Sequence, residues 1–330
     1  MLEHGGGVLA AARRYGHAPE QWLDLSTGIN PVGWSVGEIP REAWQRLPED
    51  EDGLLDVARG YYGSAHLAAA AGSQAAIEAL PWLRPPGPVA ILAPTYAEHA
   101  RAWRRAGHRV LEASAAEVPA LLDRVDALVA CNPNNPTGER LPRALLHAWQ
   151  ARLAARDGWL VVDEAYADAD PAESLARDCG RAGLIVLRSP GKFFGLAGIR
   201  LGFALGSPAL VAALAERLGP WPASGPARWV GARALADRAW QQAARARLGA
   251  AAAQLAALLD AHGLRVAGST ALFAWVPTPR AAALGEFLAA RAILVRVFAA
   301  PSGVRFGLPG SPQAFARLQA ALAAWRQGDA

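Results

Sequence analysis

Lys192 is the one lysine among the 33 Lys and Arg residues of this chain of 330 residues. It stands in the segment Ser-Pro-Gly-Lys-Phe-Phe-Gly at 189–195, not in a run of charged residues. Arginine keeps its proton near neutral pH, whereas a lysine amine can lose it, and apolar surroundings disfavour the ammonium form. A neutral amine forms a Schiff base with an aldehyde. The lysine therefore suggests Schiff-base chemistry, and a surface lysine without a role is the alternative.

Three further motifs come directly after expected strands. Ala-Gly-Ser-Gln at 71–74 opens an expected helix, where backbone N–H groups can hold a phosphate. Asn-Pro-Asn-Asn-Pro-Thr-Gly at 132–138 has the composition of a turn. Asp-Glu-Ala-Tyr at 163–166 ends an apolar run, where a carboxylate is costly to bury unless it is paired. Each motif alone has an ordinary structural explanation, so the functional hypothesis depends on the set.

The elements that must position these motifs alternate between strand and helix over about 54–205. The expected strands are 67–71, 88–93, 108–112, 126–131, 159–163, 184–188 and 201–205. The expected helices between them include 74–82, 97–106, 115–123 and 142–156. Such alternation predicts an α/β fold with a mostly parallel seven-stranded sheet and helices on both faces. Ligands of such sheets bind at the carboxyl ends of the strands, where the motifs lie.

The pattern changes after about residue 206 and predicts a smaller α+β lobe. Helices are expected at 207–218, 226–236, 238–262 and 312–326, and strands at 271–276, 293–297 and 303–307. The breaker-rich first 35 residues are expected to pack with this lobe. We therefore predict a large cofactor-binding domain at 36–205 and a small domain, formed by 1–35 with 206–330, that closes over the substrate site.

The composition indicates a globular chain with an ample core, because 52% of the residues are hydrophobic and 19% are charged. Two cysteines, Cys131 and Cys179, are too few for a disulfide framework, and their spacing fits no zinc site. No apolar stretch approaches the ~20 residues of a membrane span, and no signal peptide is evident. The arginines are dispersed and form no basic stripe. We expect a cytoplasmic protein without a metal, a membrane or a nucleic-acid partner.

Taken together, the four motifs resemble the fold-type-I family of pyridoxal-phosphate enzymes, the relatives of aspartate aminotransferase. The resemblance implies that Lys192 forms the Schiff base and that Asp163 keeps the pyridine nitrogen protonated, so that the ring is an electron sink. The other implied cofactor contacts are Asn135 and Tyr166 on the ring hydroxyl, Tyr96 stacked on the ring face, and Ser189, Arg200 and the backbone at Ser73 and Gln74 on the phosphate.

Within that family, the N-terminal part looks like the branch that decarboxylates threonine phosphate in cobalamin biosynthesis. The segments that carry this likeness are 4–6 and 24–31, together with a pair of arginines at 296 and 305. The likeness implies conversion of L-threonine O-3-phosphate to (R)-1-amino-2-propanol O-2-phosphate. The implied substrate contacts are His4, Gly5, Asn30, Asn135, Arg296 and Arg305, with Arg305 on the carboxylate and Arg296 and His4 on the phosphate.

Two alternatives stay open from the sequence. An aminotransferase that acts on histidinol phosphate or another phosphorylated amino acid would use the same ring, lysine and aspartate, because the two reactions differ in which bond is held upright over the ring. A protein that binds the cofactor without catalysis is the third hypothesis. The family also implies a homodimer, although its frequent Tyr-Pro is replaced here by Leu47-Pro48, and its usual Ser or Thr before the lysine is replaced by Gly191.

Overall fold

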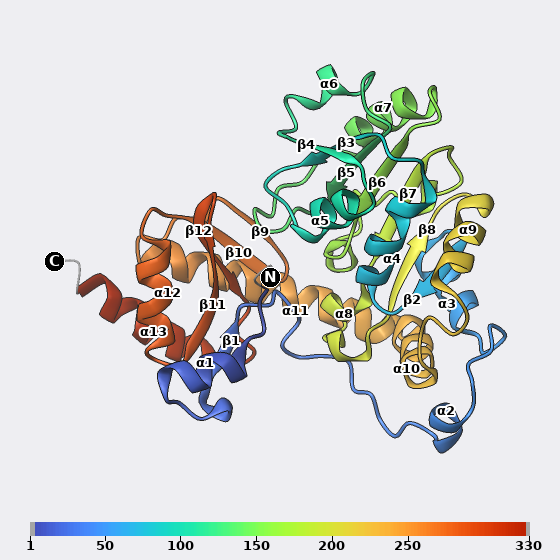
Figure 1. The fold of residues 1–330 in the computed structure, drawn as a ribbon. Helices are drawn as coiled ribbons and strands as arrows, with labels where there is room; N and C mark the ends of the chain where they lie inside the picture. The colour runs from blue at the N-terminus through green and yellow to red at the C-terminus, as the bar shows by residue number, and fades with distance from the viewer. Residues whose placement is uncertain (1–3, 328–330) are drawn as a thin grey trace. The chain divides into compact units, whose positions relative to one another are not determined.

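The structure of the protein is a computed structural model, and it describes residues 4–327. The chain divides into two compact units. The larger unit consists of residues 33–135 and 140–242, and the smaller unit of residues 4–32, 136–139 and 243–327. Each unit has its own β-sheet (Figure 1).

A seven-stranded sheet forms the centre of the larger unit, with the strand order β2-β8-β7-β6-β5-β3-β4. The strands are β2 Leu67–Ala70, β3 Pro88–Leu92, β4 Arg109–Ala113, β5 Ala127–Cys131, β6 Trp159–Asp163, β7 Leu184–Arg188 and β8 Gly202–Leu205. Strand β8 runs antiparallel to β7 and β2, and the other neighbouring pairs run parallel. The predicted mostly parallel seven-stranded sheet is therefore confirmed.

The middle strands of this sheet are buried on both faces, as parallel strands between helices are, and they are apolar except where β6 ends in Asp163 and β7 in Arg188. Every residue of β5 and β7 is buried, and β6 is buried from Leu160 to Asp163. Strand β6 therefore carries an apolar run straight to a carboxylate at its carboxyl end.

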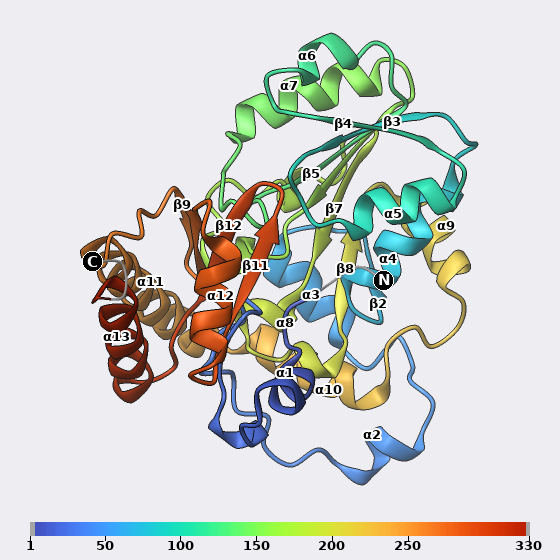
Figure 2. The ribbon, with the colours of Figure 1, turned by 60° about the vertical axis from the view of Figure 1, so that its left-hand side comes forward.

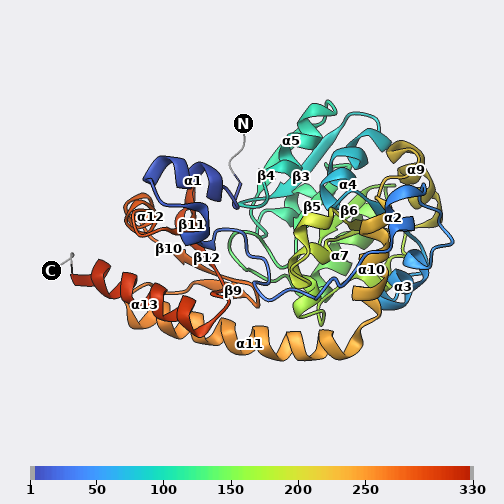
Figure 3. The ribbon, with the colours of Figure 1, turned by 90° about the horizontal axis from the view of Figure 1, so that it is seen from below.

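Helices cover both faces of the larger sheet, with α4 and α5 on one side and α7 on the other (Figure 3). The helices of this unit are α2 Arg41–Gln45, α3 Leu54–Tyr62, α4 Ser73–Ala79, α5 Glu98–Arg105, α6 Val118–Leu121, α7 Arg143–Ala154, α8 Pro190–Phe193, α9 Pro208–Leu218 and α10 Gly225–Ala236. Short 3-10 turns lie at η2 Leu80–Leu83, η3 Ala167–Ala169, η4 Ala176–Asp178 and η5 Ala197–Ile199. Helix α11, Arg238–Ala261, begins in the larger unit and continues in the smaller one.

The helix expected at 115–123 is shorter in the structure. Helix α6 has four residues, because Ser114 and Glu117 close a turn before it and Pro119 stands at its start. Both the N–H and the hydroxyl of Ser114 donate to the Glu117 carboxylate at 2.7 Å. A side chain that bonds the nearby backbone competes with helix formation in this way.

The smaller unit contains a five-stranded sheet with the order β1-β11-β12-β10-β9. Its strands are β1 Leu23–Leu25, β9 Gly268–Thr270, β10 Phe273–Pro277, β11 Ile293–Ala299 and β12 Ser302–Gly307. Its other elements are α1 Val8–Tyr15, η1 Pro19–Gln21, α12 Ala281–Ala289 and α13 Pro312–Gln327. Figure 2 shows β11 and β12 side by side, with α12 packed against them. Strand β1 pairs in parallel with β11, so the N-terminal segment belongs to this sheet.

Within residues 4–327, the structure has no helix that is both long enough and apolar enough to cross a bilayer.

Candidate functional site

Asp163, at the carboxyl end of β6, is buried and faces a histidine. Nε2 of His99, on α5, lies 2.9 Å from Oδ2 of Asp163, and both side chains are almost completely inaccessible to solvent. Burial lowers the pKa of His99, but the side chains of Cys131 and Asp163 outweigh it and raise this pKa to about 10. The imidazole is therefore protonated at neutral pH and donates to the Asp163 carboxylate. This ion pair supplies the partner that a buried carboxylate needs.

Tyr96 stands three residues before His99, and its ring packs edge-on against the imidazole, with the ring centroids 6.1 Å apart. Its hydroxyl donates to Oε1 of Gln74 at 3.1 Å. Burial raises the pKa of Tyr96 to about 12, with smaller contributions from nearby acidic groups that include Asp163. The structure thus brings Gln74, Tyr96 and Asp163, three of the predicted cofactor contacts, close together in the larger unit.

Lys192 lies on α8, just beyond the carboxyl end of β7. Its Nζ is 5.9 Å from the centroid of the Tyr166 ring, and Tyr166 is buried. Helix α8 packs against η3, the turn that follows Tyr166. Ser189 stands at the N-cap of α8 and is half-buried. The lone lysine therefore faces the loop that carries Asp163 and Tyr166.

Arg200 reaches the turn between β2 and α4. Gly72 has φ +76°, a left-handed conformation that favours glycine, and a Cβ there would lie 2.4 Å from Nη2 of Arg200. A Cβ on Gly202, the first residue of β8, would lie 2.2 Å from the backbone N of Ser73. Glycine at 72 leaves room for the Arg200 guanidinium, and glycine at 202 leaves room for the backbone N of Ser73.

The Asn-Pro motif forms a loop fixed by its own amides. The side chain of Asn132 both accepts from the N–H of Leu141 at 2.9 Å and donates to its carbonyl at 3.1 Å. The Asn134 amide donates to the Pro94 carbonyl at 2.9 Å, two residues before Tyr96. Asn135, the predicted ring-hydroxyl and substrate contact, is the half-buried residue next in this loop.

In the smaller unit, Ser26 connects the N-terminal segment with β12. Arg305, which is buried, donates from Nη2 to the Ser26 carbonyl at 2.6 Å. The N–H of Gly6 donates to the Ser26 hydroxyl at 2.8 Å, and a Cβ on Gly5 would lie 2.3 Å from the Ser26 carbonyl oxygen. The structure therefore brings Gly5 and Arg305, two predicted substrate contacts, to the same residue.

Arg296 and Arg305 are directly paired positions on the antiparallel strands β11 and β12. Paired side chains on such strands share one face of the sheet, and like charges there repel one another. A shared anion would relieve this repulsion. Asn30 is buried and accepts from the N–H of Val32 at 3.0 Å, whereas His4 is exposed.

The predicted site residues fall into two groups. The smaller unit contains His4, Gly5, Asn30, Arg296 and Arg305, and the larger unit contains Ser73, Gln74, Tyr96, Asn135, Asp163, Tyr166, Ser189, Lys192 and Arg200. One contributor to the larger group, His99, was not predicted. Its only signal in the sequence is its position on an expected helix, three residues after Tyr96.

The larger group fits the pyridoxal phosphate that the motifs imply. A carboxylate, an amine, a phenol and a guanidinium come from four separate segments of one unit, and the charges of Asp163 and Arg200 both act on the Tyr96 phenol. The same region holds one group with metal-binding atom types, namely His99, Cys131 and Asp163, whose ligand atoms lie within 4.8 Å of one another. A metal bound there would occupy Asp163, so the two uses of this carboxylate exclude each other.

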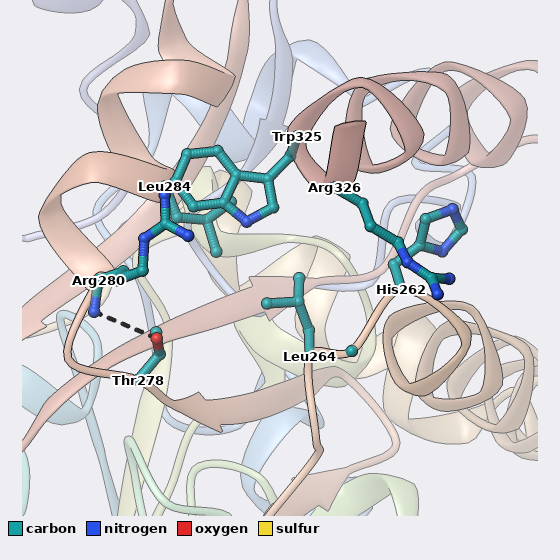
Figure 4. A pocket seen from close by; sticks show the side chains of 8 residues that line it. His262, Leu264, Thr278, Arg280, Leu284, Trp325 and Arg326 are labelled. Carbon is teal, nitrogen blue, oxygen red and sulfur yellow. Dashed lines mark hydrogen bonds between the residues drawn. The ribbon is translucent and has the colours of Figure 1, made fainter. Parts of the chain in front are cut away.

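A cavity of about 310 Å³ lies elsewhere in the smaller unit (Figure 4). Its lining residues are His262, Gly263, Leu264, Thr278, Arg280, Leu284, Trp325 and Arg326. The Arg280 guanidinium is stacked 4.4 Å from the Trp325 ring centroid, and Arg326 donates to the Ala261 carbonyl at 3.3 Å. The cavity contains none of the predicted site residues.

Comparison with known proteins identifies the family. The family model of the class I and II aminotransferases matches residues 57–322, and the chain therefore belongs to that family. The resemblance inferred from the motifs is confirmed. The chain is 54% identical to the threonine-phosphate decarboxylase of Pseudomonas aeruginosa over 99% of both chains, and 43% identical to that of a Sinorhizobium species over 98% of both.

The fold also matches a solved structure of this family. Histidinol-phosphate aminotransferase from Sinorhizobium meliloti, solved in complex with pyridoxal-5'-phosphate, superimposes with a TM-score of 0.82 at 20% identity. The match covers 98% of this chain and 95% of that one. The predicted aspartate-aminotransferase-like fold class is thus confirmed.

Proposed function

We propose that the protein is a pyridoxal-phosphate-dependent lyase that decarboxylates L-threonine O-3-phosphate to (R)-1-amino-2-propanol O-2-phosphate in cobalamin biosynthesis. The observation that carries the cofactor chemistry is the buried His99–Asp163 pair, 2.9 Å apart, in the unit that holds the lone lysine. The substrate is supported by the full-length likeness to proteins named for this reaction.

Each cofactor contact has a residue suited to it. Asp163 would hold the ring nitrogen, Tyr96 would stack on the ring, Lys192 would bond the aldehyde carbon, Asn135 and Tyr166 would bond the ring hydroxyl, and Ser73, Gln74, Ser189 and Arg200 would bond the phosphate. When bound, pyridoxal phosphate supplies an electron-poor ring that accepts the electron pair of the broken bond. His99 lies 2.9 Å from Oδ2 of Asp163 and fixes the carboxylate, which would then be placed to bond the protonated ring nitrogen.

The residues of the smaller unit suit a substrate with two anionic ends. Arg305 would bind the carboxylate, and Arg296 with His4 would bind the phosphate, while Gly5 and Asn30, together with Asn135 of the larger unit, would complete the contacts. The directly paired arginines support this assignment, because an anion between them offsets their repulsion. Binding both ends orients the substrate, and the orientation decides which bond of the α-carbon breaks. The domain boundaries at 35 and 205 stay a prediction, as does closure over the substrate.

A product assay separates the decarboxylase from the aminotransferase. Incubating the holoprotein with phosphothreonine and no keto acid should release carbon dioxide over many turnovers. Reaction only after 2-oxoglutarate is added would instead show the aminotransferase, and cofactor binding without turnover on either substrate would show the third candidate. Lys192→Ala serves as the control, because it removes the amine and should abolish both turnover and the yellow absorption of the bound cofactor.

The protein is also proposed to be a cytoplasmic homodimer, with neither a membrane nor a nucleic acid as partner. Support for the dimer comes from the larger unit, where Trp44 and Leu47, on and just after α2, are 66% and 63% exposed. Aromatic and large apolar side chains at a surface are typical of protein–protein contacts.

A further inference from the structure

Arg188, at the end of β7, is a buried cation bound by two buried carboxylates. Its guanidinium donates to Glu164 through Nη1 and to Asp168 through Nη2, and Nη1 also lies 3.1 Å from the Ser174 hydroxyl. The exposed fractions are 2% for Arg188, 0% for Glu164 and 1% for Asp168. The face of the guanidinium lies 4.8 Å from the Tyr62 ring centroid. A cation held in this way has one fixed orientation.

The two carboxylates belong to the segment that carries the ring-binding residues. Glu164 directly follows Asp163, and Asp168 comes two residues after Tyr166. The N–H of Glu164 also donates to the Leu187 carbonyl at 2.9 Å, so the ends of β6 and β7 are bonded through the backbone as well.

Arg188 itself belongs to the segment that carries the amine. It directly precedes Ser189 and stands four residues before Lys192. One guanidinium therefore connects the two chain segments that must present an acid and an amine to the same cofactor. The proposed function uses neither Arg188 nor its partners.

The two carboxylates favour the charged form of Arg188, although burial raises the pKa of Glu164. Burial lowers the pKa of Arg188, but the carboxylates of Asp168 and Glu164 outweigh it, and the net pKa is raised. Glu164 accepts further bonds, from the Ser174 hydroxyl at 2.5 Å and from the N–H of Leu175 at 2.7 Å. Each carboxylate oxygen of Glu164 thus has a donor, which fixes the segment after Asp163.

We propose that Arg188 is a positioning residue that sets the placement of Asp163 and Tyr166 relative to Lys192. The inference rests on the proposed function, because it concerns the same cofactor site. Sites of this kind tolerate small displacements poorly, and a shift of about 1 Å can cost on the order of 10²-fold in rate. Hydrogen bonds from one rigid guanidinium to both segments would hold them within this small displacement.

The test first replaces Arg188 and then one of its carboxylate partners, Asp168. Arg188→Lys keeps the charge but cannot reach two carboxylates in fixed geometry. Asp168→Asn keeps the Arg188–Glu164 bond and weakens only the connection to η3, so it provides a milder second variant. Three quantities are measured: the dissociation constant of pyridoxal phosphate from the apoprotein, the pH midpoint of the absorption of the bound cofactor, and kcat/KM.

A matched control comes from another buried arginine of the same unit. Arg228 is 3% exposed and donates to Asp52 through Nε at 2.5 Å and Nη2 at 2.9 Å. It lies on α10, a helix that contains no predicted site residue. Arg228→Lys should lower the melting temperature and leave the cofactor midpoint and kcat/KM unchanged. Arg188→Lys should shift the midpoint, weaken cofactor binding and lower kcat/KM by roughly 10- to 100-fold.

The outcomes that overturn the proposal are distinct from a failure of the proposed function. Wild-type protein that binds no pyridoxal phosphate would reject the function before any variant is compared. Wild-type-like cofactor binding, midpoint and kcat/KM in folded Arg188→Lys and Asp168→Asn would reject the positioning role. Loss of folded protein in both, with Arg228→Lys folded, would assign the network to folding alone and would also reject it.

Discussion

The charge on His99 decides how Asp163 is held, and it makes the stability of the apoprotein depend on pH. The interactions with Cys131 and Asp163 raise the pKa of His99 to about 10 despite its burial, whereas an unfolded histidine titrates near ~6.5. The folded state therefore binds one more proton than the unfolded state between about these values. The resulting stabilisation is complete below about pH 6.5 and is lost as the pH rises toward 10.

His99→Asn should remove the contribution of His99 to the pH dependence of stability. Urea unfolding of the apoprotein at several pH values from 6 to 10 measures the free energy of unfolding. We expect the wild-type free energy of unfolding to fall by a few kcal/mol across this range because of His99, on the order of 1.4 kcal/mol per unit of pKa shift, and to fall less in the variant. Asp163→Asn should flatten the curve as well. An unchanged slope in both variants would contradict a protonated His99.

Single residues divide into those that the sequence revealed and those that it could not. Lys192 and Asp163 were predictable because their types are unusual for their positions, a lone lysine and a carboxylate at the end of an apolar strand. His99 lies 64 positions from Asp163, and Arg188 lies 24 positions from Glu164. A partner at such a distance in the chain is defined only by folding, so neither pair could be assigned beforehand.

The start of β8 lies close to the turn between β2 and α4, and this contact depends on Gly202. A Cβ on Gly202 would lie 2.2 Å from the backbone N of Ser73, and backbone yields less than a flexible side chain. Gly202→Ala should destabilise the apoprotein by about 1–3 kcal/mol. It should also weaken pyridoxal-phosphate binding, because it displaces the proposed phosphate contact. Urea unfolding and a cofactor titration measure the two effects.

Gly60, in the interior of α3, is the control for that substitution. A Cβ there meets nothing within 4 Å, and the residue is exposed. Gly60→Ala should raise the stability by about 0.5–1 kcal/mol through its helix propensity and leave cofactor binding unchanged. If Gly202→Ala bound pyridoxal phosphate as tightly as the wild type, the proposed link between the close approach of Gly202 to Ser73 and phosphate binding would be contradicted.

Long elements with a clear pattern were predictable, and short ones were not. The strands expected at 159–163 and 184–188 coincide with β6 and β7. Strand β1, Leu23–Leu25, is too short to show a period of two, and its partner β11 lies near the other end of the sequence. Sequence patterns report local periodicity, whereas such a strand exists only because a sheet edge is available to it.

The molecule as a whole is assembled from segments that the sequence separates. The smaller unit combines residues from both ends of the described chain with the four residues 136–139. The first three of these end the Asn-Pro motif, and a Cβ on Gly138 would lie 2.5 Å from the backbone N of Ser269, the middle residue of β9. The motif was predicted as a turn at the cofactor, but its packing against β9 depends on a strand that was not predicted.

The proposed dimer depends on two exposed apolar residues, Trp44 on α2 and Leu47 just after it. Trp44 and Leu47 are 66% and 63% exposed, and replacing both by Ser should remove the apolar centre that an interface of about 800 Å² per partner requires. Sedimentation at micromolar concentration should then show a dimeric wild type and a largely monomeric double variant. Trp82→Ser is the control, because Trp82 is 51% exposed but stacks with Arg217 at 5.2 Å, and it should leave the dimer intact. Equal masses for the wild type and the double variant would place the interface elsewhere, since the loss of two such side chains from its centre cannot leave the association unchanged.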